Sequence, residues 1–462
     1  MIRLRLLFLI VILASVLSEC EREDRVSIPD NLFLKTLIEL GVDTDGSGHV
    51  SYREAEAVTQ LLMSNKSLRN LDGIEAFVNL EYLNCTNNFL TNIDLSNNLV
   101  LNNLYLGGNL LASLDVSHNP ALKILVCGGN ELTELDFSNN PELQILDASW
   151  NFELTYMDVS KNTKLIKLWC LVTQLTDLDV SNAQDLEFIN CVDGKITNLD
   201  ISNDTRLTEL LCDNNQLANL DVSSNVALKK IQCGQNNLTT LDFSNNPELY
   251  HLYCPYNQLI NLDILKNNNL QYLYCWENQL TSIDLTNKNK LYELICNDNL
   301  ITSLNVAKNP YLKLLSCSNN PLENLDISNN LYLDILECRS IQIDSLDVSN
   351  NTELEELSCD DNHLATIDFS NNPYLNSLTC GNNLLTNLDV SNNPYLNYLE
   401  CGSNLLDSLD ISDNGMILSL IINNMPTLYK VCVWTIPFPP GNGSIYVDSE
   451  GSPNIYFTDE CN

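Results

Sequence analysis

The stretch Leu207-Thr-Glu-Leu-Leu-Cys-Asp-Asn-Asn-Gln-Leu-Ala-Asn-Leu-Asp-Val-Ser-Ser-Asn-Val-Ala227 decides the fold, because the same phrase begins again at Leu228. As a template it reads L-x-x-L-x-C-x-x-N-x-L-x-x-L-D-x-S-x-N-x-x, with a period of 21 residues. Cysteine recurs at this interval without a slip from Cys170 to Cys401. Outward extension adds Cys85, Leu106, Cys127, Ala148 and Ile422, with one extra residue near Asn151, and predicts about seventeen rungs.

Each rung has a strand, a corner and a second extended segment. The second leucine and the cysteine lie two residues apart, so both point to one face of a strand, and that face forms the core. The asparagine three residues later lies at a corner, where its carboxamide satisfies backbone groups that the turn leaves unpaired. The second half, L-x-x-L-D-x-S-x-N, nearly repeats the first. The pattern predicts a β-rich solenoid of parallel strands with little helix. A period of about 20 to 29 residues with this pattern is typical of a leucine-rich repeat.

Fourteen of the seventeen cysteines fall at the core position of a rung. Rungs paired in parallel and in register point their sulfurs the same way, which is a poor geometry for disulfides. Metal binding needs ligands that converge on a point, whereas these thiols form a line. Free cysteine behaves as a small hydrophobic residue and is often buried. We therefore interpret the ladder as core packing rather than as disulfides or a metal site.

Residues 1–20 are interpreted as an export signal, with two arginines before an apolar run that is too short to span a membrane comfortably. The run ends in Leu17-Ser18-Glu19-Cys20, which looks like a bacterial lipobox with Cys20 as the lipidated residue. Glu19 is atypical just before such a cysteine, so plain secretion stays open as the alternative. The protein is expected to be exported, as an outer-membrane or cell-surface lipoprotein or else as a secreted protein. Contact with a membrane is expected only through the lipid at Cys20.

Residues 28–66 are not repeats and are predicted to form a small helical N-terminal cap. Helical spacing from Ile28 to Leu40 is followed by a twelve-residue acidic loop from Asp43 to Glu54 and by a second predicted helix from Tyr52 to about Leu62. The loop fits the EF-hand pattern of oxygen ligands, with glycine at its sixth position. The alternative is an acidic turn without metal. The pattern predicts one structural Ca²⁺ held by Asp43, Asp45, Ser47, the His49 carbonyl, Ser51 and Glu54.

The repeats are expected to occupy residues 67–425, and residues 426–462 are expected to form a C-terminal cap. Terminal rungs of a solenoid are atypical because they must cover an open core. Besides Cys20, only Cys432 and Cys461 lie off the ladder. In an oxidising compartment we expect these two cysteines to form a disulfide that fastens the tail to the last rung.

The formal net charge of −37 comes partly from fifteen aspartates at the L-D position, which run from Asp94 to Asp410 and are interrupted once by Asn305. Such a field repels phosphate backbones, so nucleic acid is excluded as a partner. We interpret the aspartate row mainly as a means of keeping a long apolar coil soluble. Calcium along the row is a weaker alternative, because one carboxylate per rung makes a thin site.

Function is expected on the strand positions that point outward onto the concave face of the coil. Aromatic residues gather there at two neighbouring rungs, and later rungs become acidic, with Glu337, Glu356, Asp360 and Glu400. The predicted partner-binding residues are His251, Tyr253, Tyr272, Tyr274 and Trp276. Grouped exposed aromatics favour recognition of a protein or a glycan, although aromatic residues are also simply good strand formers.

Two other classes of protein compete with a binding protein. A rigid structural spacer explains the repeats but has no need of the aromatic group. A carbohydrate-active enzyme needs a pair of suitably placed carboxyl groups, and no buried, isolated carboxyl can be identified from the sequence. No common nucleophile, zinc-protease or phosphate-loop motif occurs among the 462 residues, so no catalytic residue is predicted.

The pattern L-x-x-L-x-C-x-x-N-x-L-x-x-L-D-V-S-x-N-P resembles the 21-residue cysteine-ladder repeats of internalin J-like surface proteins of bacteria, over roughly residues 80–425. The EF-hand-like stretch before it is similar to the N-terminal part of many secreted bacterial leucine-rich repeat proteins. The resemblance implies a non-enzymatic, cell-surface or secreted protein that binds proteins or glycans, usually in adhesion.

Overall fold

The computed structural model of the protein describes residues 24–440 and 445–461. The predicted signal peptide and the predicted lipidation site Cys20 lie outside these described residues. The chain divides into two compact units, unit 1 (Met1–Leu217) and unit 2 (Ala218–Asn462).

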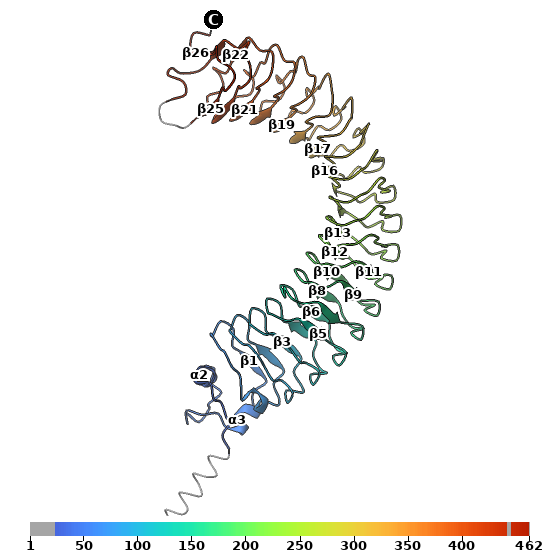
Figure 1. Ribbon diagram of the computed structural model, residues 1–462, viewed down its shortest axis with the longest axis vertical. Coiled ribbons are helices and arrows are strands. Elements are labelled where there is room, and N and C mark those ends of the chain that lie inside the picture. Colours follow the sequence, from blue (N-terminus) through green and yellow to red (C-terminus); the bar gives the residue numbers. More distant parts are fainter. Residues whose placement is uncertain (1–23, 441–444, 462) are drawn as a thin grey trace, which may run out of the picture. The chain divides into compact units, whose positions relative to one another are not determined.

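Unit 1 is a coil of rungs whose strands form a parallel sheet, the main sheet (Figure 1). Successive strands pair in register, so that Leu104 of one rung lies beside Leu125 of the next. The middle residue of each strand is buried and its neighbours are not, which is the alternation that a half-buried strand requires. The main-sheet strands of unit 1 are β1 (Gln60–Leu62), β2 (Tyr82–Asn84), β3 (Asn103–Tyr105), β4 (Ile124–Val126), β6 (Ile145–Asp147), β8 (Lys167–Trp169), β10 (Phe188–Asn190) and β12 (Glu209–Leu211).

Unit 2 repeats this arrangement with its own parallel strands in register. The main-sheet strands of unit 2 are β13 (Lys230–Gln232), β14 (His251–Tyr253), β15 (Tyr272–Tyr274), β16 (Glu293–Ile295), β17 (Leu314–Ser316), β18 (Ile335–Glu337), β19 (Glu356–Ser358), β20 (Ser377–Thr379), β21 (Tyr398–Glu400), β23 (Ser419–Ile421) and β25 (Tyr446–Asp448). The solvent-facing side of these strands is called the main-sheet face of unit 2.

The second half of a rung forms a strand only in some rungs. Unit 1 has two two-stranded sheets there and unit 2 has one three-stranded sheet. Their strands are β5 (Glu134–Asp136), β7 (Tyr156–Asp158), β9 (Asp177–Asp179) and β11 (Asn198–Asp200) in unit 1, and β22 (Ser408–Asp410), β24 (Lys430–Cys432) and β26 (Tyr456–Thr458) in unit 2. The leucine-rich repeat solenoid with little helix is confirmed, with extended segments on both sides in part of the rungs.

The predicted N-terminal cap, residues 28–66, contains α2 (Asn31–Glu39) and α3 (Tyr52–Glu56), and the 3₁₀ turn η1 (Ile74–Ala76) follows it. Asp30 caps α2 by accepting the backbone N–H of residues 32 and 33. The prediction that the second helix reaches about Leu62 is wrong, because α3 ends at Glu56 and β1 follows. Residues 60–62 pair in parallel with β2, so the first rung begins earlier than the sequence indicated. β25 adds a further rung after β23.

Buried asparagines tie neighbouring rungs together at the first corner. Asn299 is an example: its Nδ2 donates to the carbonyls of Cys275 at 3.0 Å and Cys296 at 3.1 Å. Its Oδ1 accepts the N–H of Leu280 at 3.0 Å. One side chain therefore satisfies three backbone groups in two rungs, as the sequence predicted. Groups left unsatisfied there would each cost about 1–3 kcal/mol.

A second line of buried asparagines occupies the other corner. Asn330 donates to the carbonyls of Val306 at 3.1 Å and Asn309 at 2.9 Å. Its Oδ1 is buried and accepts no hydrogen bond within the part of the chain that the structure describes. At this second corner the asparagine side chain only donates hydrogen bonds, so fewer of its polar groups are satisfied than at the first corner.

The aspartate of each L-D pair closes a local turn. Asp326 Oδ1 accepts the backbone N–H of Ser328 at 3.0 Å, and Asp347 accepts that of Ser349 at 2.9 Å. Asn305, which interrupts the row, accepts the N–H of Ala307 at 3.1 Å in the same way. The turn therefore needs a side-chain oxygen, and the negative charge is an addition to it.

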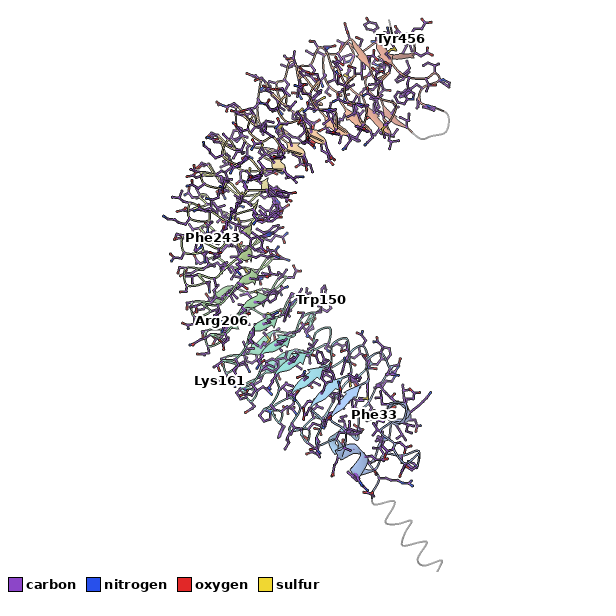
Figure 2. The ribbon with its side chains drawn as sticks, turned by 180° about the vertical axis from the view of Figure 1, so that it is seen from behind. Phe33, Trp150, Lys161, Arg206, Phe243 and Tyr456 are labelled. Atoms are coloured by element: carbon purple, nitrogen blue, oxygen red, sulfur yellow. A yellow bond between two sulfur atoms is a disulfide. The ribbon has the colours of Figure 1, made fainter. Side chains whose placement is uncertain are left out.

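The extra residue of unit 1 lies just after Asn151. The carboxamide of Asn151 still holds its corner, donating to the carbonyl of Ala148 at 2.8 Å. The insertion therefore bulges outward at Phe152, whose ring lies 6.1 Å from that of Trp150. Trp150, labelled in Figure 2, lies at the surface of unit 1 and is about half exposed.

The tail of unit 2 is joined to the coil by a disulfide between Cys432 and Cys461, whose Cα atoms lie 5.6 Å apart. Cys432 ends β24, and β26 pairs with β24 in parallel. In residues 24–440 and 445–461, none of the helices combines the length and the apolar character needed to cross a bilayer.

The fourteen cysteines at the core position are all buried and free of disulfides. Burial raises the pKa of Cys275 to about 12, so its thiol stays protonated at neutral pH. We expect the native protein to react with a bulky thiol reagent at almost none of these cysteines. Cys275→Ser should lower the free energy of unfolding by about 1–3 kcal/mol, because a hydroxyl without a partner is buried. Thiol counting and urea unfolding measure the two effects.

The control is Cys275→Ala, because Ala148 already fills the equivalent position of another rung, fully buried. It removes the sulfur without burying a hydroxyl. Disulfides between successive rungs in mass analysis of the native protein would contradict the packing interpretation.

The aspartate turns predict acid sensitivity. Hydrogen bonds from the hydroxyl and backbone N–H of the following serine hold the pKa of Asp326 and of Asp347 below the usual 3.8. A lowered folded-state pKa stabilises the fold fully above pH 3.8, and this stabilisation is lost as the pH falls through the lowered value. Asp326→Asn with Asp347→Asn should keep the turns, as Asn305 does, and lose less stability than the wild type between pH 7 and about pH 3.

Removing two negative charges also changes the repulsion within the protein, so a matched pair is needed. Glu248→Gln with Glu353→Gln removes the same charge from exposed side chains of unit 2 outside the L-D positions. If this pair changes the pH dependence of urea unfolding as much as the aspartate pair does, the turns are not responsible.

Candidate functional site

The aromatic residues singled out in the sequence lie together on unit 2, and we call them the aromatic cluster: His251, Tyr253, Tyr272, Tyr274 and Trp276. The parallel register places His251 beside Tyr272 and Tyr253 beside Tyr274. The residue between each pair on its strand is a buried leucine, so the aromatic side chains lie on the main-sheet face.

The rings of the cluster are in mutual contact. Ring centroids are 5.6 Å apart for His251 and Tyr272, 5.2 Å for Tyr253 and Trp276, and 6.2 Å for Tyr274 and Trp276. The last two pairs meet edge to face, a geometry worth about 0.5–1.5 kcal/mol beyond area burial. The expectation of exposed rings is wrong in degree: all five are half-buried, because each ring covers part of the next.

Two further tyrosines form the rim of the cluster. Tyr256 is 46% exposed and Tyr292 is 37% exposed. Their rings lie 6.2 Å from Trp276 and 6.0 Å from Tyr272, respectively. The ammonium of Lys313 lies 6.0 Å above the ring of Tyr292, a cation–π contact. The rim therefore already holds one amine against an aromatic face.

The polar atoms of the cluster are held in defined states. The hydroxyl of Tyr274 donates to the carboxylate of Glu293, and burial together with this bond raises the pKa of Tyr274. Burial, aided by the charge of Lys230, lowers the pKa of His251 to about 4. His251 is therefore neutral at pH 7, and its buried Nε2 has no hydrogen-bond partner among the described residues.

Sequence reasoning missed two supports of the cluster. A Cβ at Gly234 would lie 2.8 Å from a ring carbon of Tyr253 and 2.9 Å from Pro255, so glycine leaves the room that the tyrosine ring occupies. Glu293 fixes the hydroxyl of Tyr274 from the next strand. The first signal, a glycine directly after Cys233, was present in the sequence, whereas the second needs the register of the strands.

One predicted surface acid is not at the surface. Asp360 is only 2% exposed. Its carboxylate accepts the hydroxyl of Thr379 and the N–H of Gly381 at 2.8 Å, and it pairs with Arg339 at 3.1 Å. The carboxylate of Asp360 is therefore buried and bonded within the fold, whereas Glu356 is exposed as expected.

The acidic loop of unit 1 folds around its own carboxylates. Asp43 accepts the backbone N–H of Ser47 at 3.0 Å and of Gly48 at 2.8 Å, and Asp45 accepts that of Ser47 at 2.9 Å. Gly48 has a φ of 78°, which is favourable for glycine. The Ser47 hydroxyl lies 3.4 Å from the carbonyl of His49. Four of the predicted ligands are thus gathered in one turn.

Glu54 closes the loop from its far end. Its Oε1 accepts the N–H of Thr44 at 2.7 Å, and its Oε2 accepts the N–H and the hydroxyl of Ser51, both at 2.9 Å. Burial raises the pKa of Glu54, but these hydrogen bonds outweigh it and lower the value to about 2. Carboxylate oxygens of Asp43, Asp45 and Glu54 lie within 4.8 Å of one another. Converging, ionised oxygens of this kind are the ligand set that Ca²⁺ takes.

Comparisons with known proteins place the fold. No protein-family model matches the chain, and no curated protein matches it. Among solved structures, the functional domain of InlJ from Listeria monocytogenes, which includes a cysteine ladder, is 31% identical, with 81% of this chain and 78% of that chain covered and a TM-score of 0.65. YopM from Yersinia enterocolitica is 22% identical, with 96% and 98% covered and a TM-score of 0.69.

A third similar structure is a plant one, the leucine-rich repeat ectodomain of the receptor kinase GASSHO1/SCHENGEN3 from Arabidopsis thaliana. It is 19% identical, with 88% of this chain and 60% of that chain covered and a TM-score of 0.62. At this identity it shows the fold alone.

Parallel strands, buried leucines and asparagine corners define a leucine-rich repeat protein. More narrowly, the buried cysteine ladder and the likeness to InlJ show that the chain belongs to the family of leucine-rich repeat proteins with an internalin J-type cysteine ladder.

Proposed function

We propose that the protein binds a polypeptide partner through the main-sheet face of unit 2, with the aromatic cluster as the centre of the interface. The observation that carries this proposal is the contact network of five aromatic side chains, four of them on two adjacent strands and Trp276 just after the second. Tyrosine and tryptophan are enriched at binding hot spots because they offer a large rigid area at a low entropic cost.

The fold of the relatives supports a partner that is a polypeptide. The plant ectodomain is recorded in complex with CASPARIAN STRIP INTEGRITY FACTOR 2. A rigid sheet whose outward positions vary freely from rung to rung suits such binding, because the core repeats do not constrain the surface. A glycan partner, a rigid spacer and a surface carbohydrate-active enzyme remain as the competing functions, and the first two are outcomes of the test below.

The site of action belongs to the same proposal. The apolar run of residues 1–20 supports export, and Cys20 supports a lipid anchor that leaves the coil outside the membrane. The protein then acts as a non-enzymatic recognition or adhesion module on the cell surface.

The loop from Asp43 to Glu54 is proposed to hold one structural Ca²⁺. The negative charge comes from the converging carboxylates of Asp43, Asp45 and Glu54. The other predicted ligands are the carbonyl of His49 and the hydroxyls of Ser47 and Ser51, which lie in the same loop. The ion would offset the repulsion of three carboxylates and fasten α3 to the preceding turn.

The partner proposal is tested with Tyr274→Ala combined with Trp276→Ala. Neither side chain points into the core, so the fold should stay intact apart from the lost ring contacts, about 0.5–1.5 kcal/mol each. Binding to ligands found on peptide and glycan arrays should fall at least about tenfold, the loss expected when two hot-spot aromatics are removed.

The matched control is Tyr311→Ala with Tyr332→Ala, a pair stacked at 6.2 Å and more than half exposed on unit 2 but outside its main-sheet strands. This pair should bind like the wild type. Equal binding by the cluster variant would place the site elsewhere. Selection of glycans alone would favour the glycan function, and no ligand on either array would favour the spacer.

The calcium proposal is tested by isothermal calorimetry and by thermal unfolding with and without Ca²⁺. The wild type should take up one ion per chain, and Asp43→Ala with Asp45→Ala should abolish the uptake and the gain in Tm. Glu54→Gln should weaken binding but also loosen α3 without metal, because Glu54 accepts the capping N–H of Ser51.

Glu131→Gln with Glu153→Gln serves as the control, since it removes two exposed carboxylates from unit 1 outside the loop. It should leave calcium uptake unchanged. A wild type that takes up no calcium at millimolar concentration would end the proposal.

A further inference from the structure

Three carboxylates on the main-sheet face of unit 2 are each held by a neutral hydroxyl. Glu293 on β16 accepts the hydroxyl of Tyr274, and Glu337 on β18 accepts that of Ser316. Glu400 on β21 accepts the hydroxyl of Tyr398 at 3.0 Å. We call Glu293, Glu337 and Glu400 the carboxylate stripe. A neutral donor orients a carboxylate but leaves its charge in place.

No cation on these strands compensates the stripe. Strands β14 to β21 contain four glutamates, with Glu356 as the fourth, and no lysine or arginine. Two basic side chains beside these strands already have partners, since Lys313 pairs with Asp334 at 2.9 Å and Arg339 with Asp360 at 3.1 Å. Lys230 on β13 pairs in register with His251, three strands away from Glu293. In the described residues, no ion pair involves any member of the stripe. The face therefore presents uncompensated negative charge beside the aromatic cluster.

This arrangement selects against most partners. A neutral surface laid over the stripe would strip water from three carboxylates and offer them no counter-charge, which is costly. An acidic surface would add repulsion. A partner with ammonium or guanidinium groups replaces the lost water with charge-assisted hydrogen bonds. Discrimination by such a penalty for the wrong partner is a common source of specificity.

The aromatic cluster fits the same chemistry. Aromatic faces attract cations, and the rim already shows the ammonium of Lys313 over Tyr292. His251 adds no competing charge at neutral pH, because it is neutral there. The aliphatic stem of a lysine or arginine can lie on the rings of Tyr274 and Trp276 while its charged end reaches Glu293.

We propose that the main-sheet face of unit 2 selects an extended polypeptide segment with spaced lysine or arginine side chains, the first over the aromatic cluster at Glu293 and later ones at Glu337 and Glu400. The inference rests on the proposed function and adds the chemistry of the partner. Glu293 and Glu337 are two strands apart and offset by two residues along the strand, and Glu400 lies three strands further at the same strand position as Glu337, which gives roughly 12 and 14 Å from strand spacing and rise per residue. An extended chain covers these steps in about three and four residues.

The test uses a fluorescent eight-residue peptide with lysine at positions 1, 4 and 8 and serine or glycine elsewhere, and a second version with acetyllysine. Acetylation removes the charge and keeps the stem. Anisotropy at about 0.15 M salt, where charges further away than about 8 Å are largely screened, should show the charged peptide binding about tenfold more tightly than the acetylated one, the sum of three modest charge contacts. Glu293→Gln with Glu337→Gln and Glu400→Gln should remove this difference.

The matched control variant is Asp242→Asn with Asp263→Asn and Asp284→Asn, which removes the same charge from the other half of the rungs. It should keep the preference for the charged peptide within about twofold, because those carboxylates lie away from the main-sheet face and are screened by salt. An equal loss in this control would mean that the overall acidity of the protein, rather than the stripe, attracts the peptide, and would overturn the inference.

The aromatic variant Tyr274→Ala with Trp276→Ala separates the inference from the proposed function. If both peptides bind the wild type equally and the aromatic variant binds neither, the proposed function stands and the selection of cations is wrong. If the aromatic variant keeps the charge preference that the stripe variant loses, the stripe stands and the cluster is not the centre of the interface. Failure of every peptide to bind overturns the inference.

Discussion

The carboxamides at the first corner are the interaction on which the structure depends. Each one, such as Asn299, bonds the carbonyls of two successive rungs and an N–H of the earlier rung. Leucine and cysteine burial gives each rung its core, but burial is non-directional and does not set the register of one rung on the next. The parallel pairing of backbones and the asparagine bonds are directional and together hold it, and this register brings equivalent repeat positions side by side. Every surface property discussed above follows from that alignment.

Register converts a sequence period into a surface pattern. Because outward positions repeat every 21 residues along the chain yet stand one strand apart in space, residues as distant as Tyr253 and Trp276 become neighbours. The core positions are constrained by packing, whereas the outward ones are constrained only by what they contact. Outward positions usually hold polar residues. An outward position that departs from this therefore points to function more strongly than a changed core residue does. The aromatic cluster and the carboxylate stripe are such departures, and both lie on unit 2.

The sequence predicted the fold well because the period carries nearly all of the information. Strand, corner and buried ladder each depend on residue types within one rung, and the structure agrees with them. The predictions from the sequence were wrong where a rung departs from the template. Residues 60–62 were assigned to a helix because no cysteine marks that rung, yet their backbone pairs with β2. Asp360 was counted as a surface acid because its position usually faces outward, whereas Thr379 and Arg339 draw it inward. Contacts between adjacent rungs decide such cases, and they are invisible within a single repeat.

Contacts between adjacent rungs also determine the burial and the charge of the candidate binding face. The sequence placed five aromatic residues together, but their partial burial arises only when the rings meet across two strands. Burial there makes His251 neutral and draws the hydroxyl of Tyr274 to Glu293. A hydroxyl that serves a carboxylate in this way is no longer available as a donor to a partner, while the carboxylate keeps its charge. At Tyr274 the cluster therefore presents ring surface and an anchored negative group instead of a free hydroxyl. The proposed selection of amphipathic cations rests on that combination, which follows from contacts between rungs and not from the composition of any one of them.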